Sequence, residues 1–346
     1  MEKRTTLADI ARAASCSITT ASRALGGYSD VSARTREHVA ALALALDYHP
    51  NAIARQLQGQ RTRSIAYAAG PEAGGSEDLV FRELVALLAH ECAERDLDLL
   101  IVGPHRRNGP AGLARLVQRK RTDGVIVADT HEHDVRIRAL AAQRVPFVAF
   151  GRVSLQAGTP FVDVDGRAGM AAVVTHLAEQ GHRRIAYLGG PVGRFFVRDR
   201  RSGYEDGLTM AGLNPDPALC REGLRCLVDT VEAVRQLLDL TNPPTALVAM
   251  SDLIAVQALP EIHRRGLGVG ADIALTGFDD TLLAPALSPP LTSVQQPFQE
   301  VCRLLLDVLE QQIEQPVHAV SSSIVAPTLI VRASSVGAIR RPLVEV

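Results

Sequence analysis

The segment TLADIARAASCSITTASRAL, residues 6–25, decides the fold of the first part of the chain. Thr6 is followed three residues later by Asp9, which is the spacing of a helix N-cap with a reciprocating acid. Apolar residues then recur at the spacing of one helix face. The segment therefore predicts a short helix over about Leu7–Ala14.

Two further helices are predicted directly downstream. Ser17 is a suitable N-cap for a helix over about Ile18–Leu25, which Gly26-Gly27 ends. Ser32 is the N-cap of a longer helix that reaches about Leu46. Two short helices joined by a tight turn and supported by a third form a helix-turn-helix, whose second helix enters the major groove of DNA.

The second predicted helix carries side chains that suit DNA recognition. Ile18 and Thr19 lie at its N-terminal end, and Arg23 lies one turn on, where a guanidinium can donate to guanine O6 and N7. Short hydroxyl side chains suit phosphate contacts. The DNA contacts predicted here are Thr6, Ser17, Ile18, Thr19, Thr20, Ser22 and Arg23. An ordinary three-helix bundle with a polar face would have the same spacing, so the pattern alone leaves both interpretations open.

The charge of this part of the chain differs from that of the rest. Residues 1–65 carry nine Lys or Arg and five Asp or Glu side chains, although the formal net charge of the whole chain is −1. A positive segment attached to an acidic remainder is typical of a segment that meets phosphates.

The composition argues against several classes of protein. A length of 346 residues predicts two or three folded units. The five cysteines include no CxxC pair, so neither a zinc site nor a disulfide framework is expected. No apolar stretch of about 18 residues, the length of a membrane span, occurs, and no secretory signal is recognisable at the start. We therefore expect a cytoplasmic protein, associated with the nucleoid when bound to DNA, and no membrane partner.

The sequence gives no indication of catalysis. His131-Glu132-His133-Asp134 follows a predicted strand, where neighbouring side chains diverge, so we interpret it as a polar loop with a helix cap and predict no metal site. GxSxG, HExxH and phosphate-loop motifs do not occur. We expect a protein that is not an enzyme and that carries no cofactor.

From about Arg63 onward, short apolar runs alternate with helical segments. The runs are SIAYAAG, LDLLIVG, GVIVADT, VPFVAFG, RIAYLGG, TALVAM and DIALTGFDD. This alternation predicts a doubly wound parallel α/β arrangement, and the number of strands is too large for one small sheet. We therefore expect two similar lobes.

Ligands of open α/β sheets bind beyond the carboxyl ends of the strands. Residues at such ends are Asp129, Asp165, Asp252, Phe278 and Asp279. Arg200 lies at the start of a helix that follows a strand and a loop. These polar groups predict a ligand site between the lobes.

The whole chain resembles the lactose/galactose repressor (LacI/GalR) family of transcription regulators. The resemblance is carried by TLADIARAASCSITTASRAL, VSARTREHV, DYHPNAIARQL, GHRRIAYLGG, RRSGYEDGL, SDLIAVQAL and ADIALTGFDDTLLAPALSPPLTSVQQP. It implies an all-α helix-turn-helix domain followed by an α/β body of two doubly wound parallel-sheet lobes of periplasmic-binding-protein type. The chain would cross between the lobes near Asp163, Thr292 and Ala326.

The resemblance also implies boundaries for these parts. The helix-turn-helix would span residues 1–49, a hinge helix and linker 50–62, and the two-lobed domain 63–346. The N-lobe would comprise about 63–163 and 293–325, and the C-lobe about 164–291 and 326–346.

In this family the hinge helix folds on operator DNA and enters the minor groove as a pair. The match places it at Pro50 to about Gln58, with Leu57 as the wedge that opens a base step. Residues of the same groove would be Asn51, Ala54 and Arg55. The alternative is that Leu57 packs against the body.

Two effector contacts are implied residue by residue. Arg200 matches the arginine of the family motif R-x-x-G-[FY], and Asp279 matches the first acid of G-[FY]-D-[DN]. Either could instead belong to an ion pair that stabilises a lobe. Ser251 stands where the family usually has Asn, which puts the direct transfer of the contact at Ser251-Asp252 in doubt. The predicted effector contacts are Phe81, Asp129, Asp165, Arg200, Ser251, Asp252, Phe278 and Asp279.

These observations predict a transcription regulator, most simply a repressor. It would bind palindromic operator DNA as a homodimer, with its affinity set by a small polar effector, of which a sugar or sugar derivative is favoured. A solute-binding protein of a transporter shares the body architecture but lacks the helix-turn-helix. An enzyme on an α/β scaffold is the third alternative and needs a catalytic constellation.

Overall fold

The computed structural model describes residues 5–26, 28, 30–48, 61–70, 79–103, 110–153, 158–315 and 322–337. The chain divides into two compact units, Met1–Thr62 and Arg63–Val346. The predicted hinge helix and its residues Asn51, Ala54, Arg55 and Leu57 lie outside the described residues. The finer division of the chain into domains stays a prediction.

The first unit contains the three expected helices, α1 (Leu7–Ala13), α2 (Ile18–Leu25) and α3 (Ala33–Ala45). Two local signals place them. The Thr6 hydroxyl accepts from the Asp9 backbone amide while the Asp9 carboxylate accepts from the Thr6 amide at 3.0 Å, a reciprocal capping box. The hydroxyl of Ser17 accepts from the Thr20 amide at 2.9 Å.

A small apolar cluster holds the three helices together. Ile10 of α1, Ala21 of α2 and Val39 of α3 are completely buried in it. The alanine at the centre lets the helices approach closely, so the short helices, marginal alone, are fixed by packing. The predicted helix-turn-helix is confirmed.

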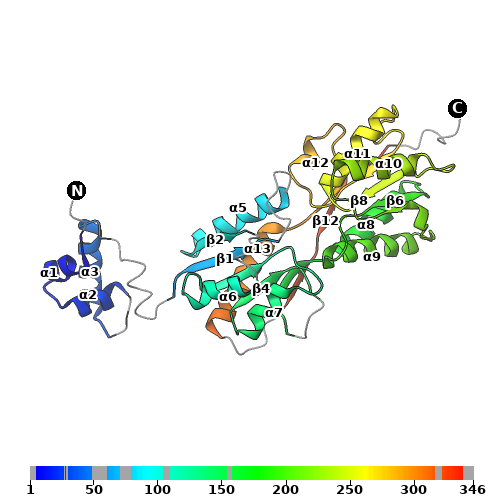
Figure 1. Ribbon diagram of the computed structural model, residues 1–346. Coiled ribbons are helices and arrows are strands. Elements are labelled where there is room, and N and C mark those ends of the chain that lie inside the picture. The colour runs from blue at the N-terminus through cyan, green and yellow to red at the C-terminus, as the bar shows by residue number, and fades with distance from the viewer. Residues whose placement is uncertain are drawn as a thin grey trace. The chain divides into compact units, whose positions relative to one another are not determined.

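The N-lobe of the second unit is a six-stranded, all-parallel sheet between two layers of helices (Figure 1). Its strand order is β11-β5-β4-β3-β1-β2. The strands are β1 (Ser64–Ala68), β2 (Asp98–Val102), β3 (Gly124–Val127), β4 (Phe147–Phe150), β5 (Phe161–Val164) and β11 (Ser323–Val325). The helices are α5 (Leu79–Glu94) and α13 (Phe298–Glu314) on one face and α6 (Pro110–Gln118) and α7 (Val135–Ala142) on the other.

The C-lobe repeats this plan with a four-stranded parallel sheet in the order β7-β6-β8-β9. Its strands are β6 (Ile185–Leu188), β7 (Cys220–Arg221), β8 (Ala246–Ala249) and β9 (Ala274–Thr276). In Figure 1, helices α8 and α9 cover one face of this sheet and α10 and α11 the other. The helices are α8 (Gly166–Glu179), α9 (Phe195–Met210), α10 (Leu227–Leu238), α11 (Asp252–Arg264) and the short α12 (Leu283–Ala286), with a 3₁₀ turn, η2, at Pro217–Leu219.

Three segments connect the lobes. The first leads from β5 into α8, the second from β10 (Ser293–Gln295) into α13, and the third from β11 into β12 (Thr328–Ile330). β10 and β12 pair with each other antiparallel, and Thr292, just before β10, bridges to Thr276 of the C-lobe sheet. The expected two-lobed architecture with parallel sheets is thus confirmed. None of the helices in the described ranges has the length and apolarity to cross a membrane.

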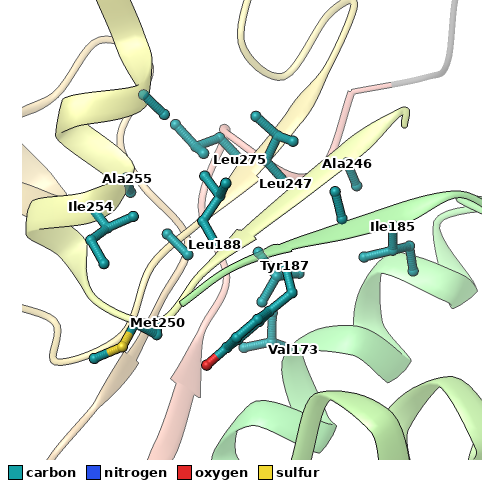
Figure 2. Close-up of a cluster of buried hydrophobic side chains, with 14 of the residues drawn as sticks. Val173, Ile185, Tyr187, Leu188, Ala246, Leu247, Met250, Ile254, Ala255 and Leu275 are labelled. Atoms are coloured by element: carbon teal, nitrogen blue, oxygen red, sulfur yellow. The ribbon is translucent and has the colours of Figure 1, made fainter. Parts of the chain in front are cut away.

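The C-lobe core explains why its strands are apolar throughout. Figure 2 shows Leu188, Leu247 and Leu275 packed on the face of the sheet that α11 covers, while Tyr187 lies on the opposite face beside Val173 of α8. Each of these residues is at most 1% exposed. A strand that is buried on both faces has no polar position, which is why the sequence showed runs rather than alternation.

Helices α8 and α9 pack closely because two glycines of α9 face α8. A Cβ on Gly203 would overlap the Arg167 carbonyl oxygen, and one on Gly207 would lie 2.7 Å from Cβ of Val174. Glycine is therefore required at Gly203 by the approach of another backbone. This approach also fixes Arg200, which lies one turn earlier on the same helix.

Gly203→Ala is expected to lower the melting temperature of the body. Overpacking against a backbone atom costs about 1–3 kcal/mol, which corresponds to about 2–4 °C for each kcal/mol in a domain of this size. Circular dichroism measures the transition. Gly103→Ala is the control, since no atom lies within 4 Å of a Cβ there. Equal melting temperatures of the two variants would contradict the packing argument.

Candidate functional site

A cavity of about 560 Å³ lies between the two lobes, beyond the carboxyl ends of their strands. Its polar lining comprises Asp129, Thr130, Asp163, Arg194, Arg200, Arg225, Ser251, Asp279, Thr281 and Gln296. Its apolar lining includes Tyr67, Leu79, Val80, Phe81, Leu84, Phe150, Phe196, Met250, Leu253 and Phe278. An apolar cavity of this size with a few converging polar groups is typical of a small-molecule site.

A buried ion pair lies at the C-lobe side of the cavity. Arg200 Nη2 is 3.0 Å from Asp279 Oδ1, and both side chains are more than 90% buried. Arg200 Nη1 donates to the Met250 carbonyl oxygen at 2.6 Å, and Gln296 Nε2 donates to the same Asp279 oxygen at 2.7 Å. The guanidinium carbon lies 3.7 Å from the ring centroid of Phe278. These contacts offset the cost of burying the two charges.

The backbone around Asp279 is held in an uncommon conformation. Asp279 has φ 107° and Asp280 has φ 51°, both in the left-handed range that side chains disfavour. The Asp279 amide donates to Val294 O at 2.8 Å, and the Asp280 carboxylate lies 2.6 Å from Arg332 Nη1. The connecting segments between the lobes therefore fix the conformation of this part of the site.

A second ion pair crosses the cavity from lobe to lobe. Arg194 of the C-lobe contacts Asp129 of the N-lobe through Nε–Oδ1 at 2.6 Å and Nη2–Oδ2 at 3.2 Å. Asp129 follows β3 with φ 52°, and Arg136 Nη2 donates to its carbonyl oxygen at 3.1 Å. Next to this pair, Arg198 contacts Glu132, and Arg152 Nη2 contacts Asp199 Oδ2 at 2.7 Å.

Six of the eight predicted effector contacts line the cavity: Phe81, Asp129, Arg200, Ser251, Phe278 and Asp279. Phe278 is completely buried beneath Arg200, and Phe81 packs against Tyr67 with ring centroids 5.9 Å apart. Ser251 caps α11 by accepting from the Ile254 amide at 3.3 Å. Arg200 and Asp279, predicted separately, are bonded to each other.

Asp165 and Asp252 do not line the cavity, which corrects the prediction for these two residues. Asp165 is the N-cap of α8 and accepts from the Ala168 amide at 2.9 Å. Asp252 is the first residue of α11, and its carboxylate is turned into the protein. The strand-end rule finds such positions but does not give the direction of their side chains.

The buried Asp252 carboxylate connects three segments. It accepts from the Thr281 amide at 2.7 Å and the Ser293 hydroxyl at 2.5 Å. Burial raises the pKa of Asp252 to about 7, and the nearby Asp279 carboxylate raises it further in the same direction. Asp252 is thus a support for the cavity and not part of its surface.

Three cavity residues escaped the sequence analysis: Arg194, Gln296 and Asp163. Gln296 directly follows β10, so the strand-end rule could have found it. Asp163 lies within β5, bonded to Arg152 Nε at 2.7 Å. Arg194 precedes α9 without a side-chain cap, and its partner lies 65 residues away, so no local pattern marks it.

The predicted metal cluster alternative finds no support in the described part of the chain. There, no group of three or more His, Cys, Asp or Glu side chains could hold a metal ion. Asp134 instead caps α7 and lies 2.7 Å from Arg136 Nη2. This arrangement agrees with a polar loop that ends in a helix cap.

The predicted DNA contacts lie on the first unit. Ile18 is 54% exposed at the first turn of α2, and Thr19 is exposed beside it. Arg23 Nη1 is 3.0 Å from Asp30 Oδ2, and its guanidinium lies 5.3 Å from the Tyr28 ring. The remaining predicted contacts are hydroxyls: those of Thr6, Ser17 and Thr20 take part in the caps, and Ser22 is half-buried.

The raised pKa of Asp252 predicts a pH dependence of stability. Its folded-state pKa of about 7 exceeds the model value of 3.8, so the folded state keeps a proton that the unfolded state releases between about pH 4 and 7. Stability is therefore expected to fall as pH rises through this range. Melting temperatures of the wild type and Asp252→Asn at several pH values test this. The variant should lose part of the slope, and an unchanged slope would contradict the assignment.

The comparisons with known proteins agree with this architecture. Residues 6–51 match the family model "Bacterial regulatory proteins, lacI family", and residues 174–335 match "Periplasmic binding protein-like domain". The chain is similar to the transcriptional regulator AglR of Rhizobium meliloti, with 34% identity over 83% of this chain and 81% of that protein. It is also similar to CelR of Thermobifida fusca, with 31% identity over 92% of this chain and 96% of that protein.

Solved structures show the same fold. A lac repressor dimer bound to operator and the anti-inducer ONPF superimposes with a TM-score of 0.81 at 28% identity, covering 97% of this chain and all of that chain. A complex of CelR with cellobiose superimposes with a TM-score of 0.71 at 29% identity, covering 96% of this chain and all of that chain. On these sequence matches, the protein belongs to the LacI family of bacterial regulatory proteins and is a helix-turn-helix transcriptional regulator.

Proposed function

We propose that this regulator is a repressor that binds palindromic operator DNA as a homodimer and responds to a small polar effector, a sugar or sugar derivative, held between the lobes. The observation that carries the proposal is the buried Arg200–Asp279 pair at the edge of a cavity of about 560 Å³. The titles of the similar structures, a lac repressor dimer on operator and a CelR–cellobiose complex, support it.

The chemistry of this pair suits a polyol. A guanidinium only donates hydrogen bonds and an ionised carboxylate only accepts them, so together they satisfy both roles of neighbouring hydroxyls. Within the described residues, Arg200 Nε is buried and has no hydrogen-bond partner. A buried donor without a partner is costly, so an acceptor atom of the ligand at Nε would be stabilised.

The position of the cavity provides a route to DNA. A ligand between the lobes contacts both and therefore shifts the equilibrium between two lobe arrangements. In a homodimer with one helix-turn-helix on each half-site, this shift would change the separation of the two hinge helices. The ligand acts here by binding alone, so we further infer a cytoplasmic protein without catalytic activity.

Arg200→Ala is expected to abolish the ligand response and leave operator binding intact. A thermal-shift screen of the purified protein against neutral sugars, sugar phosphates and nucleobases identifies the ligand, since a compound that binds only the native state raises the melting temperature. Operator affinity is then measured by gel shift with and without it. The control is Arg167→Ala, which removes an exposed ion pair with Asp206 on the same lobe. A response that survives in Arg200→Ala would refute the proposed site.

Leu57→Ala tests the hinge part of the proposal. Loss of the apolar wedge should weaken binding to a specific operator much more than binding to random DNA, because only the kinked specific complex uses it. Fluorescence anisotropy on both DNAs at one salt concentration measures the ratio. If both affinities fall equally, Leu57 contributes to the fold of the body instead.

A further inference from the structure

The cavity has two Arg–Asp pairs, and both arginines belong to the start of one helix. Arg194 is the N-cap of α9 and Arg200 follows six residues later. At a rise of about 1.5 Å per residue, their backbone positions are about 9 Å apart along the helix axis. The cavity therefore has two separate polar poles, Arg194–Asp129 and Arg200–Asp279.

The Arg194–Asp129 pole is built as firmly as the other. The two side chains are 10% and 18% exposed and make two parallel contacts, at 2.6 and 3.2 Å. A backbone hydrogen bond from Glu132 to the Gly193 carbonyl oxygen at 3.3 Å aligns the two segments. Both residues line the cavity, so the pair faces the ligand as well as bridging the lobes.

The surface between the poles is apolar. Phe196, which lies between the two arginines on α9, lines the cavity together with Phe81 and Phe150 of the N-lobe. A ligand that reaches from one pole to the other must therefore pass over aromatic faces. Sugar rings, with their apolar C–H faces and polar edges, meet both requirements.

The charges of the cavity are balanced. Among the described lining residues, three arginines (Arg194, Arg200 and Arg225) accompany three aspartates (Asp129, Asp163 and Asp279). An anionic ligand would compete with the aspartates for their arginines, whereas hydroxyls add hydrogen bonds to both partners. The lining thus favours an uncharged molecule.

From these observations we infer that the effector is a neutral saccharide of two linked rings, with one ring at each Arg–Asp pole. A single ring is too short to reach both poles. This inference rests on the proposed function, and it assigns Arg194 as the residue that determines specificity for length. The pair with Asp129 then acts as a ligand subsite in addition to a contact between the lobes.

Isothermal titration calorimetry on the full-length protein tests the inference. The probes are glucose, galactose, cellobiose, maltose and melibiose, with the 6′-phosphates of the disaccharides. At least one neutral disaccharide should bind about tenfold or more tightly than its component monosaccharides and its phosphate, since one charged hydrogen bond contributes about 1.5–3 kcal/mol.

Two variants separate a subsite from a simple contact between lobes. Arg194→Ala should lower the affinity for the disaccharide about tenfold or more and leave that for its monosaccharide within about twofold. Arg198→Ala removes the neighbouring interlobe pair with Glu132 but no lining residue, so it should change neither. Equal effects of the two variants would overturn the inference, because a contact between lobes alone would then explain them.

The other outcomes also decide. Monosaccharides that bind as tightly as disaccharides, a preference for the phosphates, or no binding of any of these sugars would each overturn the inference. The proposed function would survive these results if another ligand of the screen released the operator in an Arg200-dependent way. It fails only where Arg200→Ala keeps the response.

Discussion

The ion pair between Arg200 and Asp279 is the interaction on which the site depends. Two charges buried from water are stable only when their remaining hydrogen-bonding groups are also satisfied. Here the Met250 carbonyl oxygen, the Phe278 ring and the Gln296 amide supply those partners. The pair therefore requires the end of β8, the segment after β9 and the segment after β10 to meet at one place.

This requirement links the cavity to the segments that connect the lobes. Asp252 accepts hydrogen bonds from Thr281 and Ser293, and Asp280 contacts Arg332. Ser293 and Arg332 belong to or flank β10 and β12, which pass between the lobes. A ligand that alters the surroundings of Asp279 therefore acts directly on the strands about which the lobes would turn.

Local signals of the sequence predicted the fold well and the site in part. The caps at Thr6 and Ser17 depend on residues three positions away, so they can be found in the sequence. The strand-end rule located Asp129 and Asp279, whose side chains line the cavity, but also Asp165 and Asp252, whose side chains do not. The orientation of a side chain depends on its neighbours in space. For the same reason Arg194, whose partner lies in the other lobe, had no signature in the sequence.

The three connections between the lobes also govern when the body can fold. The N-lobe takes its edge strand β11 and its buried helix α13 from the end of the chain, after the complete C-lobe sheet. Phe298, Val301 and Leu305 of α13 fill the core beneath β1 and β3. During synthesis the first strands of the N-lobe thus expose apolar surface until almost the whole protein has been made. A chain that stops early loses the core of its first lobe and not merely its last one, so neither lobe is available as an independent fragment.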